Sequence, residues 1–275
     1  MAGAASHHVA FYEGVLGTSM ELQIFGPAEA ARKAESSALA EIDRLEAIFS
    51  RYRADSELAR WEATFETNVA VSSELAEVLA LAERYRVASK GAFDPTLSGQ
   101  PGLLWEVDGL NARRLTQRPA NLNALAKGYI VDRAAEAAHK PPGVEAVLLN
   151  LGGDLRHFGD QPVGVAVTDP LTPQENAKPF ASVKIRNQGM ATSGNYRRGP
   201  HLIDPRTGEA ADHIASATVV AKTTADADAL ATAFFVLSPR ESLRLADECD
   251  VAVLLILQNR KRHCNRAWRR RLSFK

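Results

Sequence analysis

The chain is poor in cysteine and has no long apolar run. Its 275 residues include only two cysteines, Cys249 and Cys264, which excludes a disulfide framework and any cysteine-rich zinc or iron-sulfur site. No apolar run approaches the roughly 20 residues that cross a bilayer. The opening MAGAASHHVAFYEG lacks the basic start and apolar centre of a secretory signal, and no lipobox is present. We therefore expect no membrane span, and a cytoplasmic protein as written, or a periplasmic one if a leader was removed.

The chain also lacks net charge, because 33 basic side chains balance 33 acidic ones. No global field then attracts nucleic acid or a membrane surface, and we expect no nucleic-acid partner. The one strongly basic segment is NRKRHCNRAWRRRLSFK, residues 259–275. It fits either contact with nucleic acid or an acidic partner, or a hairpin whose solvent side carries arginine.

Two common phosphate-binding motifs are absent. Neither GxGxxG nor GxxxxGK[ST] spacing occurs, so the sequence indicates no common dinucleotide fold and no P-loop. Glycine turns instead follow two apolar strands, in NLGGD from Asn150 to Asp154 and in GMATSGNY from Gly189 to Tyr196. Such turns allow backbone amides to meet a phosphate or a flat ring.

No internal repeat, low-complexity tract or linker divides the chain, so we expect one domain over residues 15–275 after an N-terminal extension of residues 1–14. Alternation predicts an opening strand at Val15 to Gly26. Further strands are predicted in EAVLLNLGGD, PVGVAVTD, ASVKIRNQGMATSG, IASATVVAK and VAVLLILQ. Helical spacing predicts helices after Pro27, from Ser73 to Ala88, from near Asn121 to before Pro141, and from Thr223 to Leu237. This order favours an α+β fold with a mixed, mostly antiparallel sheet and packed helices.

The predicted helix TTADADALATAFFVL carries acidic residues in an otherwise apolar segment. Asp228 and Thr232 are four residues apart, so a helix brings the carboxylate and the hydroxyl toward one point. Oxygen ligands of this kind suit Mg²⁺. In the alternative interpretation, Asp226 and Asp228 are first-turn acids favoured by the helix dipole, and Thr232 bonds back to a carbonyl.

Two further residues suit chemistry with phosphates. His201 precedes the rigid turn of HLIDPRTGE, and its ordinary pKa suits a general base; it also suits a structural cap of that turn. Lys127 lies in the helical ALAKGYIVD, where its ammonium can reach a phosphate or remain at the surface with its stem buried. In FSRYRADSEL, Asp55 or Ser56 is a natural N-cap for a short helix.

Together and in order, these motifs resemble the FAD:protein FMN transferases, the ApbE family. The similarity runs from about Leu16 to the last strand. The segments that carry it are LGTSMEL, FSRYRADSEL, GAFDPT, NALAKGYIVDRAAE, NLGGDLR, ATSGNY, HLIDPRTG and ADALATAFFVL.

The resemblance implies an ApbE-like, T-fold-like enzyme that binds FAD as a substrate and uses Mg²⁺ to break its pyrophosphate. It implies transfer of FMN to a threonine hydroxyl of a target protein, in a motif of the Ser-Gly-Ala-Thr type, with release of AMP. The implied metal ligands are Asp228, Thr232 and the main-chain carbonyl of Ala124. The implied FAD contacts are Leu16, Tyr52, Ala92, Phe93, Asp94, Asn121, Lys127 and Ile203. His201 is the candidate that deprotonates the acceptor, and Asp228 is the second catalytic candidate.

The sequence departs from the family pattern at two positions. Asn121 stands where the family commonly has an aspartate, which keeps hydrogen bonding but removes a charge; FAD affinity and metal loading are therefore in question. Leu16 replaces a methionine. Three other functions stay open: an FAD pyrophosphatase in which water replaces threonine, a non-catalytic FAD-binding protein, and a nucleic-acid or partner-binding module that uses the basic tail.

Overall fold

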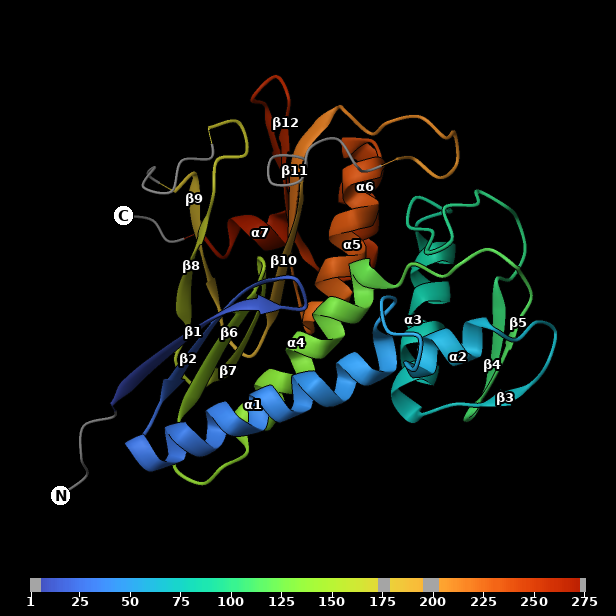
Figure 1. Ribbon diagram of the computed structural model, residues 1–275. Coiled ribbons are helices and arrows are strands. Elements are labelled where there is room, and N and C mark those ends of the chain that lie inside the picture. Colours follow the sequence, from blue (N-terminus) through green and yellow to red (C-terminus); the bar gives the residue numbers. More distant parts are fainter. Residues whose placement is uncertain (1–5, 173–178, 195–202, 273–275) are drawn as a thin grey trace.

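An eight-stranded sheet runs through the molecule (Figure 1). The computed structural model describes residues 6–172, 179–194 and 203–272. The strand order is β1-β2-β6-β7-β10-β11-β12-β13, and every neighbouring pair is antiparallel. These strands are His7–Val15 (β1), Thr18–Phe25 (β2), Ala146–Leu151 (β6), Asp154–Gly159 (β7), Gly189–Gly194 (β10), Ile214–Ala221 (β11), Ala252–Leu257 (β12) and Arg262–Cys264 (β13). The expected α+β class with an antiparallel sheet is confirmed.

Helices cover one face of this sheet, and a small hairpin covers part of the other (Figure 1). The helices in the described residues are Ala28–Phe49 (α1), Glu57–Glu62 (α2), Ser73–Ala88 (α3), Asn123–His139 (α4), Thr224–Val236 (α5), Pro239–Glu248 (α6) and Arg266–Arg269 (α7), of which α7 lies on the same face as the hairpin. The hairpin pairs Val163–Val167 (β8) with Ala181–Ile185 (β9). No helix in the described parts of the chain is both long and apolar enough to span a bilayer.

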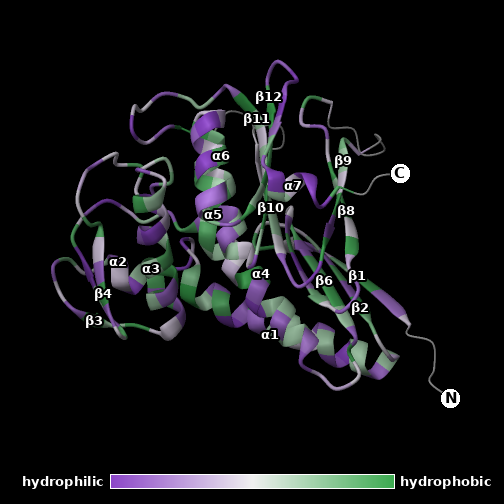
Figure 2. Cartoon of the chain, turned by 180° about the vertical axis from the view of Figure 1, so that it is seen from behind, coloured by the Kyte–Doolittle hydropathy of each residue, from purple (hydrophilic) through white to green (hydrophobic). Residues whose placement is uncertain are grey.

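The sheet separates two apolar cores. The larger core joins the sheet to α1, α4 and α5, and includes Leu22, Leu149 and Phe234. The smaller core lies between the other face and the β8–β9 hairpin with α7, and includes Val165 and Trp268. Helices α1 and α6 carry both hydrophilic and hydrophobic residues (Figure 2), as expected of helices that bury only one side.

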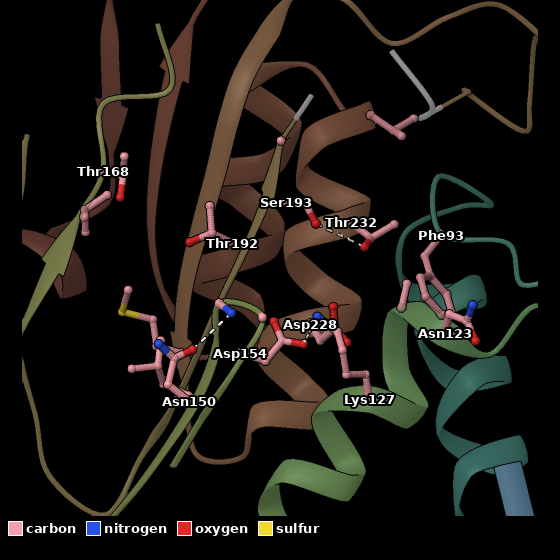
Figure 3. Close-up of a pocket in the computed structure, with 18 of the residues that line it drawn as sticks. Phe93, Asn123, Lys127, Asn150, Asp154, Thr168, Thr192, Ser193, Asp228 and Thr232 are labelled. Carbon is pink, nitrogen blue, oxygen red and sulfur yellow. Dashed lines mark hydrogen bonds and ion pairs between the residues drawn. The ribbon is translucent and has the colours of Figure 1, made fainter. Parts of the chain in front are cut away.

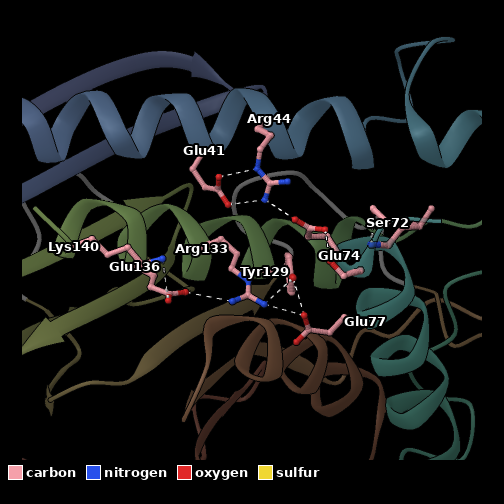
Figure 4. A network of polar contacts seen from close by, with 11 residues as sticks. Glu41, Arg44, Ser72, Glu74, Glu77, Tyr129, Arg133, Glu136 and Lys140 are labelled. Carbon is pink, nitrogen blue, oxygen red and sulfur yellow. Dashed lines mark hydrogen bonds and ion pairs between the residues drawn. The ribbon is translucent and has the colours of Figure 1, made fainter. Parts of the chain in front are cut away.

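A smaller unit of α2, α3 and a three-stranded sheet extends from the helical side. Its strands are Val69–Ala70 (β3), Trp105–Asp108 (β4) and Asn111–Arg114 (β5). Arg44 of α1 pairs with Glu41 and with Glu74 of α3, at 2.9 and 2.7 Å, and Arg133 of α4 pairs with Glu77 of α3 at 3.0 Å (Figure 4). Because these side chains are partly exposed, each pair contributes at most about 1 kcal/mol, and the apolar core supplies the main attachment.

The structure changes three expectations about strands. Residues 7–14, expected to belong to the N-terminal extension, lie in β1, which pairs along β2, and the sheet thus begins before residue 15. The segment 181–194 forms two strands, because Asn187 adopts a left-handed φ of 50° between them. The basic segment after residue 258 forms a hairpin strand and then the short helix α7, as far as the structure describes it.

The buried His157 gives a prediction about stability. Its Nδ1 accepts from the backbone N–H of Asn187 at 3.2 Å, and its Nε2 has no hydrogen-bond partner among the described residues. Burial lowers the pKa of His157 below 6.5, and the nearby charges of Arg156 and His139 lower it further. The unfolded chain therefore binds this proton more readily, so the free energy of unfolding should fall as the pH decreases below about 6.5, with a slope of up to about 1.4 kcal/mol per pH unit.

Urea denaturation between pH 5 and 7.5 measures this slope, with a His157→Gln variant as control. The variant should show a flatter dependence on pH. An equal slope in the two proteins would show that His157 is not the group that titrates.

Candidate functional site

A cavity of about 660 Å³ lies where α4, α5 and the sheet meet the loop 92–97. The side chains of Lys127, Asp154, Ser193, Asp228 and Thr232 gather along one part of its wall (Figure 3). These residues come from α4, β7, β10 and α5. The cavity therefore collects polar groups from segments that are far apart in the sequence.

Helix α5 supplies the acid and the hydroxyl predicted from the sequence. Thr223 caps its start by accepting from the Asp226 amide at 3.1 Å. The helix is buried on nearly all sides, which its alanines permit because they leave room for close packing. Asp228 is only 6% exposed and lines the cavity with Thr232, whose hydroxyl lies 3.2 Å from that of Ser193.

The two acids of this helix have separate surroundings. Asp226 accepts from Tyr85 at 2.5 Å and from Arg84 at 3.2 Å, and it is absent from the lining of the cavity. Asp228 lies in that lining. Asp226 therefore fits the structural role of a first-turn acid, whereas Asp228 is the acid of α5 that lines the cavity.

Helix α4 contributes a lysine and an irregular first turn. Ala124 has φ −80° and ψ 18°, which departs from helical geometry, and it lines the cavity. One turn later the Lys127 ammonium lies 2.5 Å from the Asp154 carboxylate, with side-chain exposures of 22% and 3%. Lys127 is therefore held inside the cavity rather than extended into solvent. Asp154 was not among the residues singled out from the sequence.

A buried carboxylate joins α4 to the start of α5. The two oxygens of Asp132 accept from the backbone amides of Thr224 and Ala225 at 2.8 and 2.9 Å. Burial raises the pKa of Asp132, whereas Arg156 on β7, at 3.6 Å, and the two amides oppose that shift. Arg156 also donates to the Lys222 carbonyl just before α5. The metal-ligand candidates of α4 and α5 are thus fixed relative to each other by one side chain.

Two glycines allow the start of α5 to lie in close contact with α4 and β10. A Cβ added to Gly128 of α4 would stand 2.6 Å from the Thr224 carbonyl oxygen, and one added to Gly189 of β10 would collide with the Thr224 nitrogen. Both contacts involve backbone atoms, which cannot move aside cheaply. The junction therefore requires glycine at both positions.

Most residues expected to contact FAD line the same cavity. These are Ala92, Phe93, Asp94, Asn121, Lys127 and Ile203. The Asp94 carboxylate is already engaged, since it accepts from the amides of Thr96 and Gly99 at 2.8 and 3.0 Å. Asp94 therefore shapes the loop that presents Ala92 and Phe93.

The remaining expected residues lie elsewhere. Tyr52 is 93% exposed, and neither it nor Leu16 is in the lining of the cavity. Leu16 adopts a left-handed φ of 48° in the β1–β2 turn. His201 falls outside the described residues. The roles of these three residues remain predictions from the sequence.

The donor chemistry of the cavity suits a hard cation. The Asp228 carboxylate, the Thr232 hydroxyl and the Ala124 carbonyl are all oxygen donors, the type that Mg²⁺ prefers, with waters and substrate phosphates completing its shell. The described residues hold no group of three or more His, Cys, Asp or Glu side chains that could bind a metal.

An α+β fold whose cavity combines hard-cation donors with a lysine ammonium suits an enzyme that acts on phosphates. The family model described as the ApbE family matches residues 16–120 and 104–255 of this chain. The chain belongs to the ApbE family and is an enzyme of the transferase class.

Named relatives and solved structures agree with this assignment. The FAD:protein FMN transferase of Haemophilus influenzae is 31% identical over 261 residues, which cover 77% of this chain and 75% of that protein. The protein of the same name from Escherichia coli K12 is 28% identical over 264 residues, with 78% and 74% covered. The ApbE protein of Thermotoga maritima has a TM-score of 0.86 at 21% identity, covering 98% of this chain and 100% of its own. The flavin transferase ApbE of Vibrio cholerae has a TM-score of 0.83 at 21% identity, with the same coverage.

The Asp132 junction gives a prediction. Asp132→Asn replaces one amide-accepting oxygen by an NH₂ group that faces a backbone N–H, so the free energy of unfolding should fall by about 1–3 kcal/mol. Urea denaturation measures this loss. Asp160→Asn, at an exposed carboxylate, is the matched control and should change stability by less than about 0.5 kcal/mol. Equal stabilities of the two variants would contradict a clamping role for Asp132.

Proposed function

We propose that this transferase moves FMN from FAD to a threonine hydroxyl of a target protein, with Mg²⁺ as cofactor and AMP as the released product. The observation that carries the proposal is the meeting of Asp228, Thr232, Ala124 and Lys127 in one cavity. The names of the relatives from Haemophilus influenzae and Escherichia coli K12 support the donor and the transferred group.

In this proposal Asp228, Thr232 and the Ala124 carbonyl would hold Mg²⁺. The bound cation would neutralise negative charge on the pyrophosphate and on the AMP leaving group. Lys127 adds a positive charge beside the pyrophosphate. Asp154, at 2.5 Å, orients the Lys127 ammonium. The chain thereby positions the charged groups of FAD before the acceptor arrives.

The proposed reaction exchanges the phosphoanhydride bond of FAD for a phosphate ester bond to threonine. The threonine oxygen forms a bond to the FMN phosphorus, and the bond from that phosphorus to the bridging oxygen breaks. AMP leaves with the bridging oxygen, and the hydroxyl proton passes to His201, the candidate base. His201 keeps this role on the sequence alone.

The FAD site in this proposal combines the cavity wall with residues beyond it. Ala92, Phe93 and Asp94 lie in one loop. The backbone N–H of Asn121 donates to the Pro95 carbonyl at 2.5 Å, which joins this loop to the start of α4. Ile203 contributes an apolar contact, with Leu16 and Tyr52 as outer contacts. Asn121 thus retains a backbone role in shaping the site, whatever the missing charge costs in FAD affinity.

The direct test incubates the purified chain with FAD, Mg²⁺ and a target fragment that bears a Ser-Gly-Ala-Thr motif. Mass spectrometry of the fragment and AMP release are the two readouts. Fragment that gains FMN together with AMP supports the transferase. AMP without labelled fragment would indicate a pyrophosphatase, and FAD binding with neither product would indicate a non-catalytic FAD-binding protein.

Asp228→Ala should lower turnover by at least about a thousandfold, because it removes a metal ligand. Its far-ultraviolet circular dichroism should match that of the wild type. Asp226→Ala, two residues away on the same helix but outside the cavity, is the control and should keep most of the turnover. Full Mg²⁺-dependent activity in Asp228→Ala would remove Asp228 from the metal site.

His201→Ala should slow transfer to threonine more than it weakens FAD binding, because a base acts in the chemical step. Single-turnover kinetics measure the transfer rate, and fluorescence titration measures the FAD dissociation constant. An unchanged transfer rate would exclude His201 as the base.

A further inference from the structure

A transferase with two substrates needs room for both. The FAD-contact candidates of the cavity include Phe93, from the loop after α3, and Asn121, just before α4. Figure 3 shows Thr168 on the side of the cavity away from Phe93 and Asn123, with Thr192 and Ser193 of β10 between them. Thr168 directly follows β8. The wall that includes β8 is therefore separate from the proposed FAD wall.

The cavity meets β8 along its edge. Five consecutive residues, from Gly164 through Thr168, line the cavity. Successive side chains of a strand point to opposite faces, so a consecutive run lines a cavity only where the cavity runs beside the backbone. Val165 and Val167 are buried in the smaller core, whereas Gly164 and Ala166 are exposed and small. The backbone at these two positions is therefore accessible.

This edge of β8 carries no partner strand among the described residues. β8 pairs with β9 alone, in a two-stranded sheet. The Val167 carbonyl accepts from the Phe180 amide at 2.8 Å, so Val167 directs its backbone groups toward the β9 side. Because this direction alternates along an antiparallel strand, Gly164 and Ala166 direct their N–H and C=O groups toward the cavity.

We propose that the acceptor protein binds as an extended segment along the open edge of β8 and adds a third strand to the β8–β9 hairpin. This inference rests on the proposed transfer to a protein hydroxyl. A row of alternating donors and acceptors at strand spacing matches a polypeptide backbone. The acceptor hydroxyl then points past Ser193 of β10 toward Asp228 and Thr232. Recognition comes mainly from backbone hydrogen bonds, with Glu21 and Gln23 of the cavity lining available to the acceptor side chains.

Ala166→Pro tests the edge from the enzyme side. Proline removes the outward N–H and is tolerated at an edge position whose N–H does not belong to the ladder. The KM for the acceptor fragment should rise about tenfold, the equivalent of one lost hydrogen bond, while the KM for FAD stays within about twofold. An unchanged KM for the acceptor, in a variant with the wild-type melting temperature, would overturn the proposal.

Modified acceptor fragments test the same edge with the wild-type enzyme. Fragments with a single N-methylated amide, placed at successive positions beside the threonine, should lose transfer at every second position, because only alternate amides of an added strand face β8. Equal loss or equal tolerance at successive positions would overturn the strand geometry. Failure of the unmodified fragment to accept FMN would instead contradict the proposed function, and the inference with it.

Discussion

The buried carboxylate of Asp132 is the contact on which the geometry of the cavity depends. It accepts from two backbone amides at the start of α5 and faces Arg156 of β7, so one side chain of α4 connects three elements. Those elements carry Lys127, Asp154 and Asp228. Amides at a helix start lack partners within the helix and favour negative charge, which explains why a carboxylate is stable there despite its burial.

Close packing around α5 follows from its composition. Its alanines leave the helix narrow, and the two glycines that face Thr224 bring α4 and β10 to backbone contact. Asp228 of this helix lies in the lining of the cavity, and in our proposal its carboxylate is a ligand of the cation. The same packing leaves a cavity with the proposed FAD wall on one side and the open edge of β8 on the other.

Periodicity and turn chemistry predicted much of the fold. Helix α3 begins and ends where the spacing of Ser73 to Ala88 placed it, and Asp228 and Thr232, expected one turn apart on a helix, both lie on α5 and line the cavity. Strand β7 was missed because Arg156 and His157 interrupt its apolar character, although both side chains are buried. The pairing of Lys127 with Asp154, and of Asp132 with α5, depends on contacts between distant segments, which no local pattern contains.

The most direct test of the proposed metal site is a crystal structure of the chain with FAD and Mn²⁺, a hard cation that anomalous scattering can locate. We expect one anomalous peak in the cavity, coordinated by the Asp228 carboxylate, the Thr232 hydroxyl and the Ala124 carbonyl. A Mn²⁺ ion bound to FAD but away from Asp228 and Thr232, or no ion in a cavity that holds FAD, would contradict the account.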